Sequence, residues 1–387
     1  MIPYGRQDIS EDDCASVLEI LKSDWLTQGP SGPKFEQALA NYVHAKHVVT
    51  ASSATAALHI TYLALGLGAG KQVWTSPNTF VATANAALYC GASIDFVDID
   101  PNTYCLSLDF LEEKLKHHAS NNLPLPYLVT MVHFAGQSCD MKRLAVLGQL
   151  YGFKIVEDAS HAIGADADGG KIGQCQYSDA CIFSFHPVKI ITTGEGGAIT
   201  TNNSALAKHL QELRSHGVTR DPTRMIGESE GAWYYEQIDL GYNYRLTDLQ
   251  SALGLSQLNR IDQFIAQRRQ LAARYDMLLE KLPLILPWQY PDGRSAFHLY
   301  PVQINASQSR LDRACVFMAM REAGIGVNVH YIPVYKQPYF KKFGFSPSQF
   351  PNAERYYAST MTLPLFSQMT NLQQDCVVES LTKILIG

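Results

Sequence analysis

The spacing of the cysteines in this sequence does not indicate a structural role for them. The 387 residues contain eight cysteines, and no two have the Cys-x-x-Cys spacing that is typical of zinc sites and redox motifs. The sequence therefore argues against a disulfide framework and against a metal site. We expect eight free cysteines with buried thiols.

An excess of one charge and long apolar runs are also lacking. The formal net charge is -5 and the charges are scattered, so we expect no basic surface that would bind nucleic acid. No apolar run reaches the roughly 18 residues that a membrane span needs, and residues 1–8 lack a signal-peptide pattern. These absences predict a soluble cytoplasmic protein with neither a nucleic-acid nor a membrane partner.

Apolar side chains are plentiful, at 46% of the residues against 17% charged, which is typical of a globular protein. The length fits one large domain and one smaller domain. We predict a large domain over 12–257 and a small carboxy-terminal domain over 258–387, with segment 1–11 packing near the latter. A cluster of helix and strand breakers marks the passage into the small domain: Pro283, Pro287, Pro291 and Gly293.

Apolar strand-like runs alternate with helical patterns through the first two-thirds of the chain, which predicts an α/β fold with a parallel sheet. The predicted helices include 54–65 and 80–89, and residues 258–282 predict one long amphipathic helix. The predicted strands are 48–50, 72–75, 94–97, 127–133, 154–157, 180–185 and 198–201.

Lys189 follows one of these apolar strands and precedes the turn Gly194-Glu195-Gly196-Gly197. Burial of an unpaired ammonium is costly, so a lysine held there usually has a lowered pKa and acts as a nucleophile or Schiff-base former. Asp158 ends another predicted strand. A lysine that forms an imine and a carboxylate that faces a pyridinium nitrogen are the protein groups that pyridoxal phosphate chemistry requires. The alternatives are a solvated lysine and an aspartate that caps a turn.

Other polar and aromatic residues follow strand ends, where ligands bind in open α/β sheets. Ser184 could donate a hydrogen bond to a phosphate, and the small residues at 52–56 open a helix whose amino terminus would attract one. His161 could orient Asp158 or pack on a cofactor ring, and Phe80 could stack on that ring. A capped helix, a structural histidine and a core phenylalanine are the alternatives.

Three segments together resemble the DegT/DnrJ/EryC1/StrS family of pyridoxal-phosphate-dependent nucleotide-sugar aminotransferases. They are 155–161, 183–189 with 194–197, and 241–248, and the likeness runs through essentially the whole chain. The resemblance implies a fold-type I α/β transferase, with a large, mostly parallel sheet domain and a smaller carboxy-terminal α/β domain. It also implies pyridoxal 5'-phosphate as cofactor and a homodimer whose active sites are shared between subunits.

The resemblance further implies roles for individual residues. Lys189 would bind the cofactor as an imine, Asp158 would face the pyridinium nitrogen, and Phe80 would stack on the ring. His161 stands where some family members carry glutamine. The residues implied to hold the phosphate are Ser53, Ala54, Thr55, Ser184 and, from the partner subunit, Asn243.

Within the family, segments 23–30, 214–217, 250–258 and 329–335 are similar to the transaminases of pseudaminic acid biosynthesis. This likeness implies transfer of the amino group of L-glutamate to C4 of a UDP-linked 4-keto-6-deoxy-N-acetylhexosamine, giving UDP-4-amino-4,6-dideoxy-N-acetyl-β-L-altrosamine. The residues implied to bind the sugar nucleotide are Tyr4, Asp24, Trp25, Leu26, Thr27, Asn328, Val329, His330 and Tyr331.

Several alternatives remain beside this hypothesis. The chain could aminate another nucleotide-linked 4-keto or 3-keto deoxysugar, or it could be a non-catalytic regulator that binds pyridoxal phosphate. A sugar 3-dehydratase of the same fold has histidine in place of the lysine, so Lys189 argues against that activity. A nucleotide-hydrolysing enzyme is disfavoured because Ile172 stands where a P-loop needs Ser or Thr, and residues 168–170 predict a hairpin turn instead.

Overall fold

The computed structural model describes residues 1–167, 169–291 and 294–387. Asp168 of the predicted hairpin turn and Gly293 of the predicted breaker cluster lie outside the described residues. The short strands β6 (Asp166–Ala167) and β7 (Gly170–Lys171), on either side of residue 168, pair antiparallel.

A seven-stranded sheet forms the centre of the protein, with strand order β1-β9-β8-β5-β4-β2-β3. All neighbouring pairs from β8 to β3 are parallel, and β9 alone runs antiparallel to both of its neighbours. The seven predicted strands all lie in this sheet, so the predicted α/β class is confirmed. The strand bounds are β1 His47–Ala51, β2 Gln72–Thr75, β3 Ser93–Phe96, β4 Leu128–Val132, β5 Lys154–Asp158, β8 Ala180–Ser184 and β9 Gly197–Thr201.

The sheet is buried on both faces, as a mostly parallel sheet requires. Along β8, Cys181 and Phe183 point into one apolar cluster with Phe35, while Ile182 points into another that contains Trp74. The helices that supply these clusters include α2 Ser31–Val43, α3 Ala54–Ala64, α4 Val81–Tyr89, α5 Leu108–Ser120, α6 Met141–Tyr151 and α7 Ser204–Arg214.

The long helix predicted over 258–282 is confirmed, and it begins at Ile261 and ends at Leu279. The chain forms α8 (Asp248–Leu258), turns at Asn259 and Arg260, and continues as α9 (Ile261–Leu279). The turn is fixed by the Arg260 guanidinium, which donates to the Asp8 carboxylate at 3.0 Å and to the Asp13 carboxylate at 2.6 Å. Asp13 lies in the first turn of α1 (Glu11–Leu21), which packs against α8, and Asp8 lies in the segment just before this helix.

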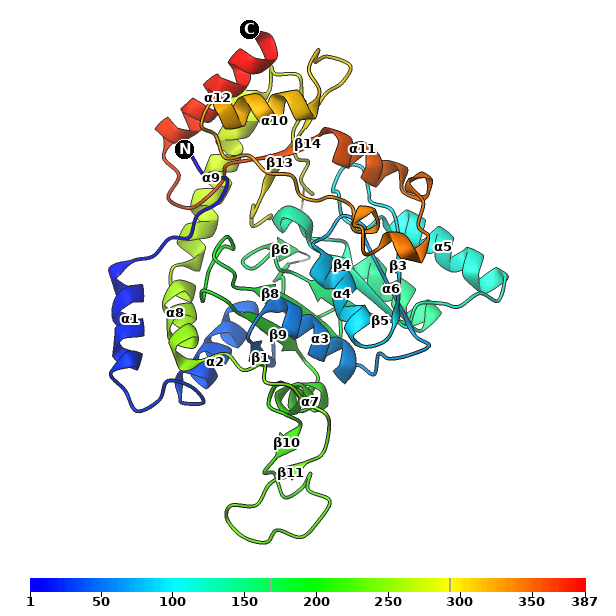
Figure 1. Cartoon of the computed structure of the whole chain (residues 1–387), viewed down its shortest axis with the longest axis vertical. Helices are drawn as coiled ribbons and strands as arrows, with labels where there is room; N and C mark the ends of the chain where they lie inside the picture. Colours follow the sequence, from blue (N-terminus) through cyan, green and yellow to red (C-terminus); the bar gives the residue numbers. More distant parts are fainter. Residues whose placement is uncertain (168, 292–293) are drawn as a thin grey trace.

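The helix α9 passes from the main sheet to a second, smaller sheet in the upper part of Figure 1. Phe264 near its start packs in a cluster of the main sheet, and Tyr275 near its end packs in a third cluster. The smaller sheet is antiparallel. Its strands and covering helices are β12 Leu284–Ile285, β13 Tyr300–Ile304, β14 Thr360–Leu363, α10 Arg313–Glu322 and α12 Asn371–Ile386.

Two segments of sequence cross between these regions. Ile2 forms a β-bridge with Ile325, next to the small sheet. Residues 334–356 return to the main sheet, where Tyr335 and Phe350 join its largest apolar cluster. The short helices of this segment are η2 Val334–Lys336, η3 Lys341–Phe343, η4 Pro347–Gln349 and α11 Pro351–Ser359, and a similar turn, η1 Phe134–Gly136, follows β4. The domain division at residue 258 stays a prediction.

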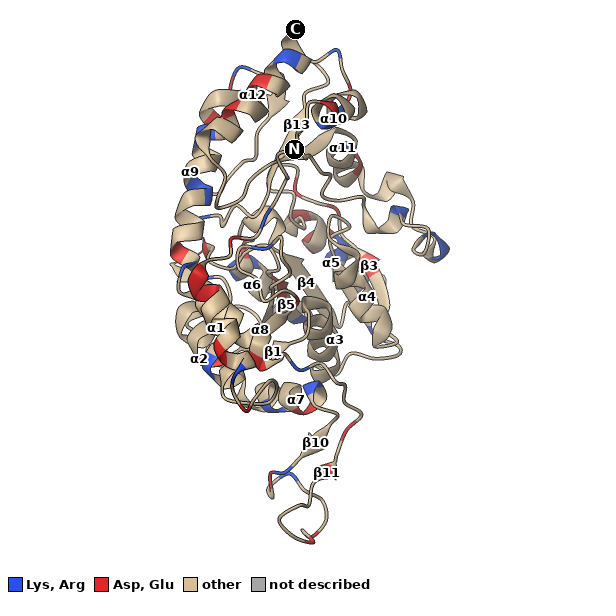
Figure 2. Cartoon of the chain, turned by 60° about the vertical axis from the view of Figure 1, so that its left-hand side comes forward, with Lys and Arg blue, Asp and Glu red and all other residues tan. Residues whose placement is uncertain are grey.

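An arm built on β10 (Val218–Thr219) and β11 (Glu236–Gln237) projects from the body at the bottom of Figure 1. Ile226 and Trp233 on this arm are 89% and 71% exposed. Figure 2 shows both signs of charge interspersed along α9 and α12. None of the helices in the described part of the chain combines the length and apolar character that a bilayer span needs.

The expectation of eight buried thiols is wrong in part. All eight cysteines are free, and four are buried, at positions 105, 139, 175 and 181. Cys14, Cys315 and Cys376 are exposed instead, because they lie on the solvent-facing sides of α1, α10 and α12.

Candidate active site

Asp158 is the last residue of β5 and is 5% exposed. One carboxylate oxygen accepts a hydrogen bond from the Thr83 hydroxyl at 2.7 Å, and the other accepts from the Ser160 backbone N–H at 3.1 Å. The bond from Ser160 is the turn contact expected of an ordinary aspartate. The bond from Thr83 is a contact with α4, and it fixes the carboxylate at the carboxyl edge of the sheet, where α/β enzymes bind ligands.

Lys189 lies in the turn after β8, where its backbone N–H donates to the carbonyl of His186 at 2.8 Å. Its side chain is partly buried, and none of the ion pairs between described residues involves it. Burial lowers the pKa of its amine to about 8, although the nearby Asp158 carboxylate opposes the shift. At pH 7 about a tenth of such an amine is neutral, which is far more than for a solvated lysine.

This lowered pKa predicts how Lys189 should react in protein from which any cofactor has been removed. Because only the neutral amine attacks acetic anhydride, we expect the acetylation rate of Lys189 to reach half its maximum near pH 8. Peptide mass spectrometry at a series of pH values measures this rate for each lysine. Lys154 at the start of β5 serves as the internal control, and an identical pH profile for the two lysines would contradict the prediction.

His161 is buried beside Tyr331 rather than bonded to Asp158. Its Nδ1 accepts from the Ala135 backbone N–H at 3.2 Å, and its Nε2 lies 2.9 Å from the Tyr331 hydroxyl. The two rings are stacked, with centroids 5.9 Å apart. Burial, together with the positive charge of Lys189, lowers the pKa of His161, so the imidazole is neutral at physiological pH.

The amino terminus of α3 lies close to the β8–β9 pair, which carries Ser184. Ser53 caps the helix, and its hydroxyl accepts from Ala56 N–H at 3.1 Å. Ser184 pairs with Gly197, and a Cβ at Gly197 would lie 2.6 Å from the Ala54 nitrogen. This close approach brings Ser184 beside the first turn of α3. A helix amino terminus with unpaired amides is suited to a phosphate, and Ala54 and Thr55 supply the first of these amides.

Phe80 and Asn243 are both exposed. Phe80 precedes α4 and is 59% exposed, with its ring centroid 6.2 Å from that of Tyr331. This position excludes the core alternative and suits a stacking surface. Segment 241–248 lies beside the start of α3, because the backbone N–H of Ser52, just before that helix, donates to the Tyr244 carbonyl at 2.7 Å. The Asn243 side chain itself points to solvent.

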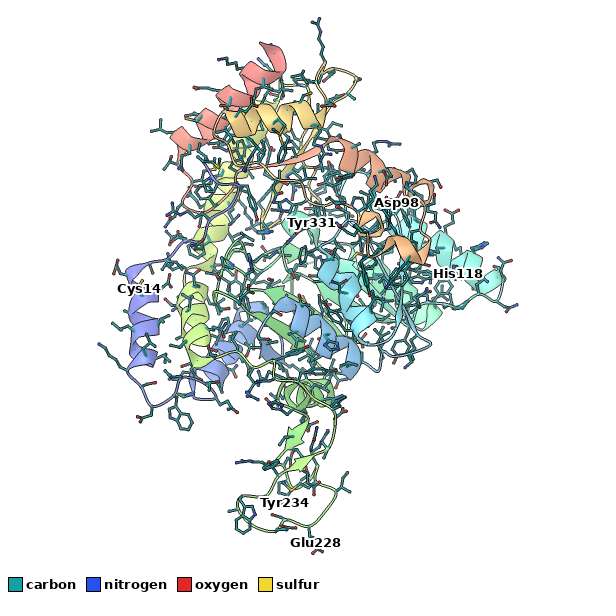
Figure 3. All side chains as sticks on the ribbon, viewed as in Figure 1. Cys14, Asp98, His118, Glu228, Tyr234 and Tyr331 are labelled. Atoms are coloured by element: carbon teal, nitrogen blue, oxygen red, sulfur yellow. The ribbon has the colours of Figure 1, made fainter. Side chains whose placement is uncertain are left out.

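The sugar-nucleotide residues implied by resemblance fall into two groups. Tyr4 and His330 pack with ring centroids 5.6 Å apart, and Tyr331 lies between the main body and the upper part of the molecule in Figure 3. Asn328 and Val329 lead into this cluster. The second group, Asp24, Trp25, Leu26 and Thr27, lies in the exposed loop between α1 and α2, and the structure of one chain does not bring it to Lys189.

Two residues at this site were missed by sequence reasoning. The ring of His298 lies 4.5 Å from that of His161, and its Nδ1 has no hydrogen-bond partner among the described residues. Arg268 of α9 is buried, and its guanidinium donates to the carbonyls of Phe297, His298 and Leu365. The only signal in the sequence was the position of His298 among apolar residues just before β13, and histidines in such positions are too common to indicate a site.

The comparisons with known proteins agree on the family. The model of the DegT/DnrJ/EryC1/StrS aminotransferase family matches residues 7–382. The spore coat polysaccharide biosynthesis protein SpsC of Bacillus subtilis (strain 168) is 39% identical over 100% of this chain and 97% of its own length. A UDP-4-amino-4,6-dideoxy-N-acetyl-beta-L-altrosamine transaminase of Campylobacter jejuni (strain 81-176) is 36% identical over 100% and 98%.

Solved structures give the same result. Helicobacter pylori PseC, an aminotransferase involved in the biosynthesis of pseudoaminic acid, superposes with a TM-score of 0.90 at 28% identity over 99% of both chains. The putative sugar aminotransferase Spr1654 from Streptococcus pneumoniae, in its PMP form, has a TM-score of 0.89 at 28% identity, again over 99% of both chains. The predicted fold-type I architecture is therefore confirmed, and the chain belongs to the DegT/DnrJ/EryC1/StrS aminotransferase family.

Proposed function

We propose that this sugar aminotransferase moves the amino group of L-glutamate to C4 of a UDP-linked 4-keto-6-deoxy-N-acetylhexosamine. The product would be UDP-4-amino-4,6-dideoxy-N-acetyl-β-L-altrosamine, a step of pseudaminic acid biosynthesis. The observation that carries this proposal is the 36% identity, over the whole chain, to transaminases that bear the name of this product. The fold of Helicobacter pylori PseC supports it.

Pyridoxal phosphate is the cofactor of this family, and Spr1654 has been solved in PLP and PMP forms. When bound, it supplies the electron sink for moving an amino group between carbon atoms. The residues of this chain fit it, because an amine of lowered pKa, a fixed carboxylate and an open helix amino terminus lie at one edge of the sheet. We propose that Lys189 binds it covalently and that Asp158 faces its ring nitrogen.

The remaining cofactor contacts follow from the same geometry. We propose that Ser184 and the first turn of α3, from Ser53 to Thr55, hold the phosphate, and that Phe80 covers the ring. Lys189 would then serve as the base, because its Nζ is neutral often enough at physiological pH to take the proton from Cα of glutamate. The same Nζ returns a proton to C4 of the sugar in the second half of the reaction.

We also propose a homodimer with shared sites. The loop between α1 and α2 exposes Trp25 and Leu26, and the arm exposes Ile226 and Trp233, which is more apolar surface than isolated loops usually carry. A second subunit would cover such surface. It would also give Asn243 and the 24–27 loop a route to the site of the partner, which neither has within one chain.

A second candidate function is amination of a different nucleotide-linked 4-keto or 3-keto deoxysugar. SpsC of Bacillus subtilis favours it, because that protein of spore coat polysaccharide biosynthesis is 39% identical, more than the 36% of the altrosamine transaminases. Both candidates use the same lysine, carboxylate and amino donor. They differ only in the ring that the sugar site accepts.

The substrate proposal predicts a preference between two epimers. We expect a higher kcat/KM with UDP-2-acetamido-2,6-dideoxy-β-L-arabino-hexos-4-ulose than with its D-xylo epimer at C5. The physical reason is that the two epimers differ in the direction of the C6 methyl, and a pocket shaped for one methyl position discriminates by about 10–200-fold. Incubation of each ketosugar with ¹⁵N-labelled glutamate, followed by NMR of the product, measures the preference. An equal or higher kcat/KM with the D-xylo sugar would favour the second candidate.

A further inference from the structure

The hydrogen bonds of His161 define which of its ring nitrogens carries the proton. Nδ1 faces the Ala135 backbone N–H at 3.2 Å, and a backbone N–H can only donate. Ala135 holds this amide in place with a φ of 58°, a conformation that few residues other than glycine adopt. Nδ1 must therefore be the acceptor, since an imidazolium or the Nδ1–H tautomer would set two hydrogens against each other.

The proton of the neutral imidazole therefore lies on Nε2. Nε2 is 2.9 Å from the Tyr331 hydroxyl oxygen, so the imidazole donates and the phenol accepts. Because the Tyr331 oxygen accepts this hydrogen bond through a lone pair, the hydroxyl hydrogen of Tyr331 is left to donate to another acceptor. No acceptor for that hydrogen occurs in the described parts of the chain, and the side chain is only partly buried, so the hydroxyl can reach a bound ligand.

Contacts with neighbouring residues fix the position of the Tyr331 side chain and so of its hydroxyl. Its backbone N–H donates to the Asn78 side-chain oxygen at 3.2 Å, and its ring lies 6.2 Å from Phe134 on one side and 6.2 Å from Phe80 on another. Burial raises the pKa of the phenol, so the hydroxyl keeps its hydrogen across the physiological range. The chain therefore presents an O–H donor close enough to Asp158 for the carboxylate charge to act on the phenol and help raise its pKa.

We propose that the Tyr331 hydroxyl donates a hydrogen bond to the keto oxygen of the incoming sugar, and that His161 is the positioning residue that directs this donor. The proposal rests on the ketosugar function above and adds a role that the lysine and the carboxylate do not fill. A ketone oxygen gains negative charge as an amine attacks its carbon, and a donor already in place stabilises that charge. Glutamate enters as an amine, and a keto oxygen arises only in the last, hydrolytic step that releases 2-oxoglutarate. The donor should therefore matter less to the proton transfer from glutamate, which the cofactor absorbance reports, than to the attack on the ketosugar.

The two halves of the reaction give separate readouts. For Tyr331→Phe in the holoenzyme, we expect the half-reaction with the ketosugar to slow by about a hundredfold, as for loss of one oxyanion donor. The half-reaction with glutamate, followed by stopped-flow absorbance of the cofactor, should slow less than about threefold. Equal losses in both halves, or a shifted cofactor spectrum before any substrate is added, would mean that the hydroxyl serves the cofactor and would overturn the proposal.

Substitutions at His161 test the positioning role. Glutamine offers an oxygen to Ala135 N–H and an NH₂ to the Tyr331 oxygen, so His161→Gln should retain most of the ketosugar half-reaction. His161→Leu offers neither and should lose about tenfold. Tyr335→Phe is the matched control, because its hydroxyl bonds Glu354 away from the site and should leave both half-reactions unaffected. Equal rates for the Gln and Leu variants would contradict the role of His161.

A measurement that needs no sugar tests the direction of the bond. Long-range ¹H–¹⁵N NMR of the histidine-labelled enzyme distinguishes the tautomers, and the His161 signal is assigned by its absence from His161→Gln. We expect Nε2–H at neutral pH, and an Nδ1–H or doubly protonated ring would overturn the proposal. A wrong substrate assignment gives a different result. The wild type would then aminate none of the offered ketosugars while the Nε2–H signal stayed in place.

Discussion

Replacing Lys189 with alanine is expected to abolish transamination. The change removes both the amine that would bind the cofactor and the base that would move the proton, and loss of the proton transfer alone slows such reactions by about 10²–10⁴-fold. Both half-reactions should fall together, because each needs the same Nζ. The fold should survive, since Lys189 is only partly buried and takes part in none of the ion pairs of the described residues. Circular dichroism and thermal unfolding check this.

The wild-type enzyme offers a direct test of the same assignment. Reduction with borohydride should fix the cofactor to the protein, and peptide mass spectrometry should find the pyridoxyl group on Lys189. Lys154→Ala is the matched control, because this lysine lies at the opposite end of β5 from Asp158. An adduct on any other lysine, or full turnover by Lys189→Ala, would remove Lys189 from the chemistry.

The alanine variant also tests whether sites are shared between subunits. If Asn243 acts in the site of the partner subunit, mixed dimers of Lys189→Ala and Asn243→Ala chains should contain one site with both residues intact. Activity of the mixture should then exceed that of either variant alone. The absence of any recovery would mean that Asn243 and Lys189 serve the same chain's site, or that Asn243 serves none.

The sequence predicted best what depends on local pattern. The seven strands of the sheet were found because a strand buried on both faces reads as a continuous apolar run. Asp158 and Lys189 were singled out because charged residues at or shortly after the ends of such runs are unusual. The start of the long helix was placed at residue 258 instead of Ile261, because the turn at Arg260 is held by Asp8 and Asp13, far away in the sequence.

The residues that sequence reasoning missed share a different property. His298 and Arg268 reach the site from the passage into β13 and from α9, and their roles depend on how two separately built regions meet. The two regions approach each other closely at Gly136, where a Cβ would lie 2.8 Å from the Phe297 nitrogen. Contacts of this kind leave no periodicity in the sequence. Likewise, the exposure of the 24–27 loop could not be read from its aromatic composition.

Asp158→Asn is expected to lower turnover by about a hundredfold or more, because it removes the charge that would keep the pyridine nitrogen protonated and the ring an electron sink. The substitution keeps the shape of the side chain. Its amide can still contact the Thr83 hydroxyl and accept from Ser160 N–H, so folding and cofactor affinity should change far less than kcat.

The same variant makes a second, independent prediction about Lys189. The Asp158 carboxylate raises the pKa of the lysine amine against the effect of burial. Its removal should therefore lower that pKa from about 8, and the acetylation profile of cofactor-free protein should move to lower pH. A loss of turnover with an unmoved profile would mean that the two groups do not sense each other. Near-normal turnover would mean that Asp158 has only a structural role, in the turn that it forms with Ser160. A charge that faced the ring nitrogen could not be removed without loss of rate.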